Sequence, residues 1–239
     1  MRCLLVLALL VPLLAPSVAR AQTQEDTQLW LTAEGRAELT RRLRLAVQEE
    51  LRVGTEAGYD ETFTDIELTY RLSRAIAAAG HYRLILLDGE TRHRATGDLV
   101  ARLRQKPIEL TYRLRLQATS RENDDALVPI RNKFKLALTT LGDLEPYVAV
   151  EFHYQLSPAS EYRETRFYLG AQYQVTGALD VEAFYLELRE TNVAMPETNH
   201  VLGVGVVFSF RQVKGKGKGR GKGKGDDDDE APEADTGGE

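Results

Sequence analysis

Apolar and polar side chains alternate along most of this chain, and the clearest stretch runs from Ile108 to Thr119. In that stretch the even-numbered residues are apolar, and the odd-numbered residues are charged or polar. Successive side chains of a β-strand point to opposite faces, so the pattern predicts a strand with one apolar face and one polar face.

Eleven segments of this kind follow one another, and most reach the 9–11 residues that a tilted strand needs to cross a bilayer. The predicted strands are 28–39, 43–53, 63–72, 81–88, 92–103, 108–119, 130–140, 147–156, 165–175, 179–189 and 201–210. Two alternatives stay open. Apolar residues that recur every four positions over 32–52 also fit an amphipathic helix. Bacterial barrels usually have an even number of strands, so one strand could be missed or merged near 55–61 or 73–81.

The first residues have the pattern of a secretory signal peptide. A positive start at Arg2 precedes an apolar stretch from Leu4 to Leu14, and Ala19-Arg20-Ala21 fits a cleavage site. The apolar stretch is too short for a membrane-spanning helix, so we expect residues 1–21 to be removed near Ala21. The single cysteine, Cys3, lies within this signal. The mature chain therefore offers no disulfide and no thiol ligand or nucleophile.

These features predict an all-β protein, an antiparallel up-and-down transmembrane β-barrel of 10–12 strands over residues 22–211. Short turns are expected to alternate with longer polar loops, such as 122–125 and 192–199. The expected location is the bacterial outer membrane, with membrane lipid as the surrounding partner. A soluble periplasmic β-sandwich that binds partners also alternates in this way and is the alternative fold.

The last segment, 212–239, differs from the rest in composition. A run of alternating basic residues and glycine over 214–225 is followed by five acids over 226–230. With almost no apolar residue this tail cannot bury a core, and we expect it to be disordered. Its basic run could contact an anionic polymer of the cell envelope. The formal net charge of -5 is small and indicates no nucleic-acid partner.

The polar faces of the predicted strands carry many charged residues, which a barrel would direct into its lumen. We expect Glu34 to pair with Arg44, and Glu109 or Asp98 to pair with Arg113. Such a network either closes the lumen or lines a narrow pore with a bias toward anions. The candidate lumen residues are Glu34, Arg36, Arg44, Glu50, Arg52, Glu67, Arg71, Arg94, Asp98, Glu109, Arg113, Arg115, Arg131, Lys133, Glu151 and Arg166.

Signals for catalysis are weak in this sequence. His153 and Ser157 share one strand face with Glu151 nearby, the residue types of a lipid hydrolase, but His153 points to the predicted lumen rather than to lipid. His81, His93 and His200 fall at predicted strand ends, where packing at the membrane interface is expected. The sequence has no phosphate-binding glycine loop and no zinc or calcium spacing, so we expect no cofactor and no metal.

Several short motifs recur in an order that resembles a bacterial family of outer-membrane barrels known only as a domain of unknown function. The resemblance covers about 28–210, implies the fold and the location, and implies no activity or catalytic residue. The motifs are Gln28-Leu29-Trp30, Glu50-Leu51-Arg52, Tyr70-Arg71, His81-Tyr82-Arg83, Arg92-His93-Arg94, Tyr112 to Gln117, Ile130-Arg131-Asn132-Lys133, Tyr147 to Glu151 and Leu202-Gly203.

Together these observations favour a non-enzymatic envelope protein, either a scaffold or a narrow anion-biased channel with a charged lumen. A lipid-modifying barrel enzyme and a periplasmic binding protein are the two alternatives.

Overall fold

The computed structural model describes residues 24–54, 58–87, 89–121 and 124–210. The predicted signal peptide and tail lie outside these ranges. Within them the chain forms eleven strands. The strands are β1 (Gln24–Glu38), β2 (Leu43–Gly54), β3 (Gly58–Arg71), β4 (Ile76–Leu87), β5 (Glu90–Gln105), β6 (Ile108–Arg121), β7 (Asp124–Leu138), β8 (Leu144–Ser157), β9 (Glu161–Thr176), β10 (Leu179–Glu190) and β11 (Glu197–Phe210).

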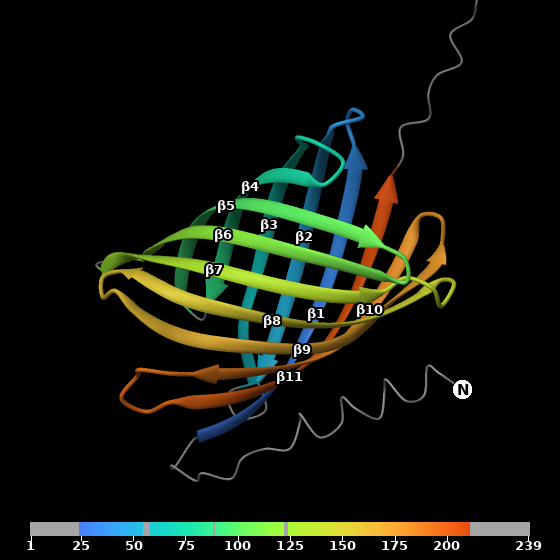
Figure 1. Cartoon of the computed structure of the whole chain (residues 1–239). Helices are drawn as coiled ribbons and strands as arrows, with labels where there is room; N and C mark the ends of the chain where they lie inside the picture. The colour runs from blue at the N-terminus through green and yellow to red at the C-terminus, as the bar shows by residue number, and fades with distance from the viewer. Residues whose placement is uncertain (1–23, 55–57, 88, 122–123, 211–239) are drawn as a thin grey trace, which may run out of the picture.

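The strands close into a single barrel in which each strand pairs with its neighbours in sequence. All these consecutive pairs are antiparallel, but β1 and β11 close the barrel as a parallel pair. The arrowheads of β1 and β11 therefore point the same way in Figure 1. The prediction of 10–12 strands is confirmed, whereas a fully antiparallel barrel is wrong at the closure. Because direction alternates along the chain, an odd number of strands makes the first and last run the same way.

The two ends of the barrel are named here by the strand ends that they hold. The C-terminal mouth contains Phe210 and the turn after β1, and the N-terminal mouth contains the start of β1. The strand bounds leave two to six residues between consecutive strands. These bounds do not show the expected alternation of short turns and long loops. β7 begins at Asp124 and β11 at Glu197, so both strands start within the two segments that were expected to be loops.

Two strands differ from expectation in an informative way. β4 begins at Ile76 rather than at 81, because the small residues up to Gly80 pair with β3 and β5 although they show no alternation. The helix considered over 32–52 is wrong, since that segment forms the hairpin of β1 and β2. The β-sandwich alternative is also wrong, because a closed barrel leaves no second sheet.

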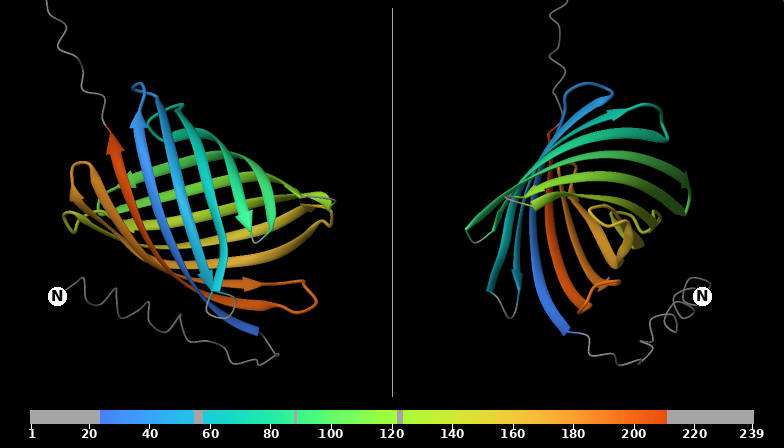
Figure 2. Two further views of the ribbon diagram at one scale, coloured as in Figure 1. Left: turned by 180° about the vertical axis from the view of Figure 1, so that it is seen from behind. Right: turned by 90° about the vertical axis from the view of Figure 1, so that its left-hand side faces the viewer.

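The barrel has an apolar exterior and a polar interior, which reverses the arrangement of a water-soluble protein. Leu202, Leu169 and Leu116 point outward with 56%, 53% and 50% of their surface exposed. Glu151, in contrast, points inward and is fully buried. The views in Figure 2 show the tilted strands wrapping around this interior.

One sector of the interior is apolar rather than charged. Trp30, Leu186 and Val201 form a buried cluster on β1, β10 and β11, and Phe184 packs against it. The ring of Phe184 lies over Gly203 of the neighbouring strand, where an added Cβ would come within 2.0 Å of it. Glycine is therefore required at this position by a close approach rather than by a turn.

Candidate functional site

Strand register places the charged interior residues opposite one another. Asp98 of β5 is the direct partner of Arg115 on β6, and Glu151 of β8 is the direct partner of Lys133 on β7. Directly opposed side chains on one face lie close enough to interact. The alternation seen in the sequence therefore becomes a continuous charge network inside the barrel.

Glu151 is the centre of this network. Its Oε1 accepts hydrogen bonds from Nη2 of Arg113 and from Nε of Arg131, both at 3.0 Å. Its Oε2 accepts a hydrogen bond from the hydroxyl of Tyr168, also at 3.0 Å. A carboxylate that is shut away from water is tolerated only with such charged and hydrogen-bonded partners. Glu151 thus ties β6, β7 and β9 together from β8.

A second cluster surrounds His81 on β4. The carboxylate of Asp98 accepts two hydrogen bonds from Arg115, at 2.7 and 2.6 Å, in the forked geometry that guanidinium favours. Nδ1 of His81 lies 3.1 Å from Oδ1 of Asp65, and Nε2 lies 3.2 Å from Oδ2 of Asp98. Arg83 donates a hydrogen bond to the other oxygen of Asp65 at 2.8 Å. His81 therefore bridges the carboxylates of β3 and β5.

A third cluster combines charge with aromatic rings. Arg52 pairs with Glu50 at 2.7 Å and also with Glu61. Its guanidinium carbon lies 3.8 Å from the ring centroid of Trp30 and 5.0 Å from that of Phe63. Such cation–π contacts strengthen where water is excluded. Arg52 therefore links the charged sector to the apolar sector.

Two positively charged side chains of the interior contact neutral groups. Nζ of Lys133 lies 3.6 Å from the ring centroid of Tyr168. Nε of Arg94 donates a hydrogen bond to the hydroxyl of Thr119 at 2.9 Å. Among the residues that the structure describes, no carboxylate oxygen lies within 4 Å of either cation. The interior around them is therefore biased toward positive charge.

The remaining predicted lumen residues also lie on the inner face. Arg71 lies exposed at the C-terminal mouth. The others form the following pairs: Glu34 with Arg36, Arg44 with Glu67 at 3.0 Å, Glu109 with Arg102 at 3.1 Å and Arg104 at 2.6 Å, and Arg166 with Glu164.

The structure pairs these residues differently from the expectation. Asp98 pairs with Arg115 rather than Arg113, and Arg113 reaches across to Glu151 instead. Strand register decides these two pairings, and the pattern of a single strand does not reveal it. Glu34 pairs with Arg36 two positions along its own strand rather than with Arg44.

Several functional residues were not among the predicted network. His81 was expected at a strand end, but the early start of β4 places it in the middle of the strand and inside the barrel. Arg83 and Glu164 share its inner face and join the network. The alternation of His81 and Arg83 with Tyr82 and Leu84 would have identified the inner face of β4. His93 and His200, in contrast, point outward.

The candidate hydrolase residues do not form a catalytic arrangement in the part of the chain described. His153 is buried in the lumen, where Nδ1 lies 3.4 Å from Glu164 and Nε2 lies 3.9 Å from Glu151. Ser157 ends β8, and its backbone oxygen accepts a hydrogen bond from Gln155. The serine hydroxyl has no hydrogen bond to His153 among these residues. This geometry gives the serine no general base.

Several side chains inside the barrel are almost fully buried. Phe63, Ile85, Leu186 and Val201 have at most 2% of their surface exposed, as does Glu151, and they come from strands around the barrel. Neighbouring acids and bases of the network are nearly as buried.

The fold and its interior define a class: a closed eleven-strand β-barrel with a charged lumen. A model of the family described as protein of unknown function (DUF2490) matches residues 27–198, and the chain belongs to this family. A comparison with curated proteins gives no match. Over the described residues, no helix is long and apolar enough to cross a membrane. Over the same residues, no group of three or more histidine, cysteine, aspartate or glutamate side chains is arranged to hold a metal ion.

Proposed function

We propose that this chain is an outer-membrane β-barrel whose lumen is closed by its own side chains and which serves the envelope as a non-enzymatic scaffold. The observation that carries this proposal is the reversed partition of side chains. Large apolar residues such as Leu202 cover the outside, while Glu151 and its arginines fill the inside. Contact of such an apolar exterior with lipid hydrocarbon is favourable, whereas its exposure to water costs free energy.

The closed topology supports a location in a membrane. A bilayer offers no water to satisfy backbone groups, so a spanning sheet must have no open edge. Here every strand has two paired neighbours, because the parallel pair of β1 and β11 completes the ring.

Amphipathic pairs on the outer surface supply a second line of support. The hydroxyl of Tyr82 lies 2.7 Å from Nδ1 of His93, and the hydroxyl of Tyr185 lies 2.7 Å from Nδ1 of His200. Both pairs are exposed, and the histidine of each pair lies three residues after the start of its strand, toward the N-terminal mouth. Side chains with an apolar body and a polar tip favour the boundary between lipid and water. We therefore propose membrane lipid as the partner of this surface.

Fluorescence quenching by brominated lipids tests the proposal. The native chain has one tryptophan, Trp30, which lies inside the barrel. A variant with Trp30→Phe and Leu116→Trp moves the fluorophore to the outer surface. In vesicles of lipids brominated along their acyl chains, the Leu116→Trp signal should be strongly quenched and the Trp30 signal of the wild type should be weakly quenched. Equal quenching, or release of soluble protein from the vesicles, would contradict the membrane-spanning barrel.

A narrow anion-selective channel is the second candidate function, and one observation favours it. The C-terminal mouth is lined by many arginines. A basic entrance would admit anions in preference to cations if the packed centre opened. Conductance measurements separate this candidate from the closed scaffold.

A further inference from the structure

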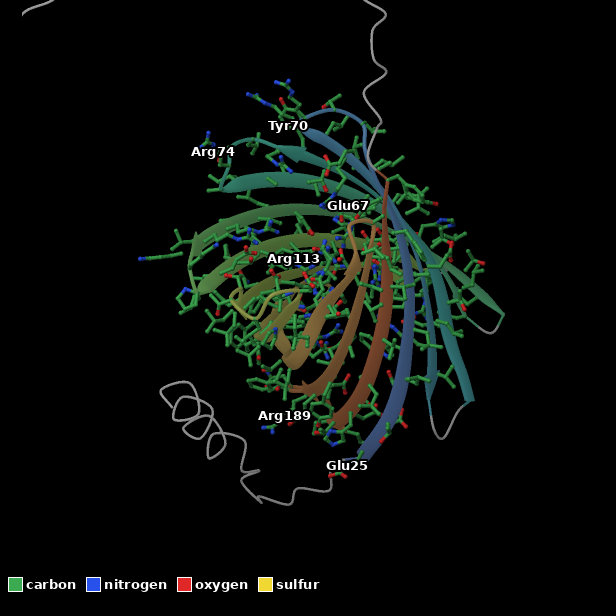
Figure 3. The ribbon with its side chains drawn as sticks, turned by 90° about the vertical axis from the view of Figure 1, so that its right-hand side faces the viewer. Glu25, Glu67, Tyr70, Arg74, Arg113 and Arg189 are labelled. Carbon is green, nitrogen blue, oxygen red and sulfur yellow. The ribbon has the colours of Figure 1, made fainter. Side chains whose placement is uncertain are left out.

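The C-terminal mouth contains a cavity of about 230 Å³ between β2 and β6. Figure 3 shows Glu67 and Arg113 within the ring of strands, and Arg74 at its edge. The charged side chains that line the cavity are Arg42, Arg44, Arg71, Arg74, Arg102, Arg113 and Arg115, together with Glu38, Glu67 and Asp98. Seven arginines face three carboxylates in this lining, and two of the seven, Arg102 and Arg113, also pair with Glu109 and Glu151 beyond it. The cavity therefore keeps an excess of positive charge.

Two similar turns hold the outer arginines in place. In the turn after β1, Thr40 Oγ1 accepts hydrogen bonds from the backbone nitrogens of Arg42 and Leu43, at 3.1 and 3.0 Å. In the turn after β3, Ser73 Oγ accepts hydrogen bonds from the backbone nitrogens of Ala75 and Ile76, at 3.2 and 3.0 Å. Such side-chain bonds fix a turn locally. Each turn thus places an arginine at the rim of the cavity.

Two of the three acids of the lining already have partners, but several arginines do not. Glu67 pairs with Arg44, and Asp98 pairs with Arg115. For the outer arginines, no carboxylate oxygen of the described chain lies within 4 Å of the guanidinium groups. These arginines are Arg42, Arg71 and Arg74.

Two arginines of the lining also have a donor without an acceptor. Nε of Arg44 and Nε of Arg113 are buried and make no hydrogen bond to any described residue. A buried donor without a partner costs free energy, typically about 1–3 kcal/mol. The guanidinium groups that an anion in the cavity would contact are the exposed ones of the outer arginines, to which it would supply acceptors and negative charge.

We propose that this mouth is a binding site for a phosphoryl group, carried either by a soluble phosphate or by a lipid headgroup. Guanidinium groups match phosphate oxygens in a forked geometry. A dianion neutralises more of this excess positive charge than a single carboxylate does. The site uses residues that the closure of the lumen does not require, because Arg42, Arg71 and Arg74 lie at the rim. It therefore goes beyond the proposed scaffold function.

Calorimetric titration of the full-length refolded barrel with inorganic phosphate tests the site. Arg42→Gln combined with Arg71→Gln should weaken binding by at least tenfold. The matched control is Arg41→Gln combined with Lys106→Gln, which removes the same charge from exposed positions of the same mouth that do not line the cavity. This control should change binding by less than twofold. Titration with a short-chain phosphatidate separates the sources, since tighter binding of this lipid assigns a headgroup and equal binding assigns soluble phosphate.

Two results would overturn the inference. One is equal weakening by the two double variants, because bulk charge alone would then explain the binding. The other is failure of phosphate to bind the wild-type barrel. A barrel that inserts into vesicles and binds no phosphate leaves the proposed function intact, so the two failures are distinguishable.

Discussion

Replacing Glu151 by glutamine tests whether the interior network holds the barrel together. The substitution keeps the size of the side chain and removes its charge. Arg113 and Arg131 would then lie in the interior without the negative charge of the carboxylate. The one amide oxygen of glutamine would be left to accept the hydrogen bonds of Arg113, Arg131 and Tyr168. Removing one partner of a buried ion pair costs about 3–5 kcal/mol. Because glutamine retains one oxygen acceptor, we expect a loss near the lower value, about 3 kcal/mol.

Urea unfolding of the barrel in lipid vesicles measures this loss. Trp30 reports on the interior, since it packs against Arg52 at 3.8 Å and is the single tryptophan of the chain. With a slope of about 2 kcal/mol per M, a loss of 3 kcal/mol lowers the unfolding midpoint by about 1.5 M. Glu187→Gln is the matched control, because Glu187 pairs with the exposed Arg189. Exposed pairs contribute about 0–1 kcal/mol. A midpoint for Glu151→Gln within 0.3 M of the control would refute the role of the network.

Three further predictions concern the outer face, the packing of the interior and the closure. Leu116→Arg should impair insertion into vesicles by about 2–4 kcal/mol if the site lies at mid-depth, whereas Leu116→Ala should have little effect. Gly203→Ala should destabilise the barrel by about 1–3 kcal/mol in the same urea assay, because the new Cβ meets an aromatic ring. Gly97→Ala, which meets nothing within 4 Å, should be neutral or slightly stabilising. Leu31→Cys with Val204→Cys should form a disulfide across the parallel pair, visible by altered mobility on non-reducing gels; its absence under oxidation would contradict the register.

The alternation of apolar and polar residues predicts most of the strands because each strand has one face toward the interior and one toward the exterior. It identifies the inner face of β6 from Glu109 to Thr119 without any knowledge of neighbouring strands. It fails at the start of β4, where Ile76 and the small residues after it carry no contrast between faces.

The partners within the lumen depend on information that a single strand does not contain. Asp98 meets Arg115 because β5 and β6 pair in that register, and a shift of two residues would bring it to Arg113 instead. The parallel closure likewise follows from the number of strands rather than from any residue. Local pattern therefore predicts the faces, whereas the contacts across the barrel arise from tertiary pairing.

Single-channel recording tests the central claim, a membrane barrel closed by its own charge network, most directly. The mature protein is refolded, inserted into a planar bilayer and recorded at neutral pH, with insertion verified by the quenching of an outward tryptophan. A silent bilayer with inserted protein is the predicted result, because Glu151 and its neighbours are almost fully buried inside the barrel. Discrete conductance steps with anion preference would contradict the closed lumen and establish the channel.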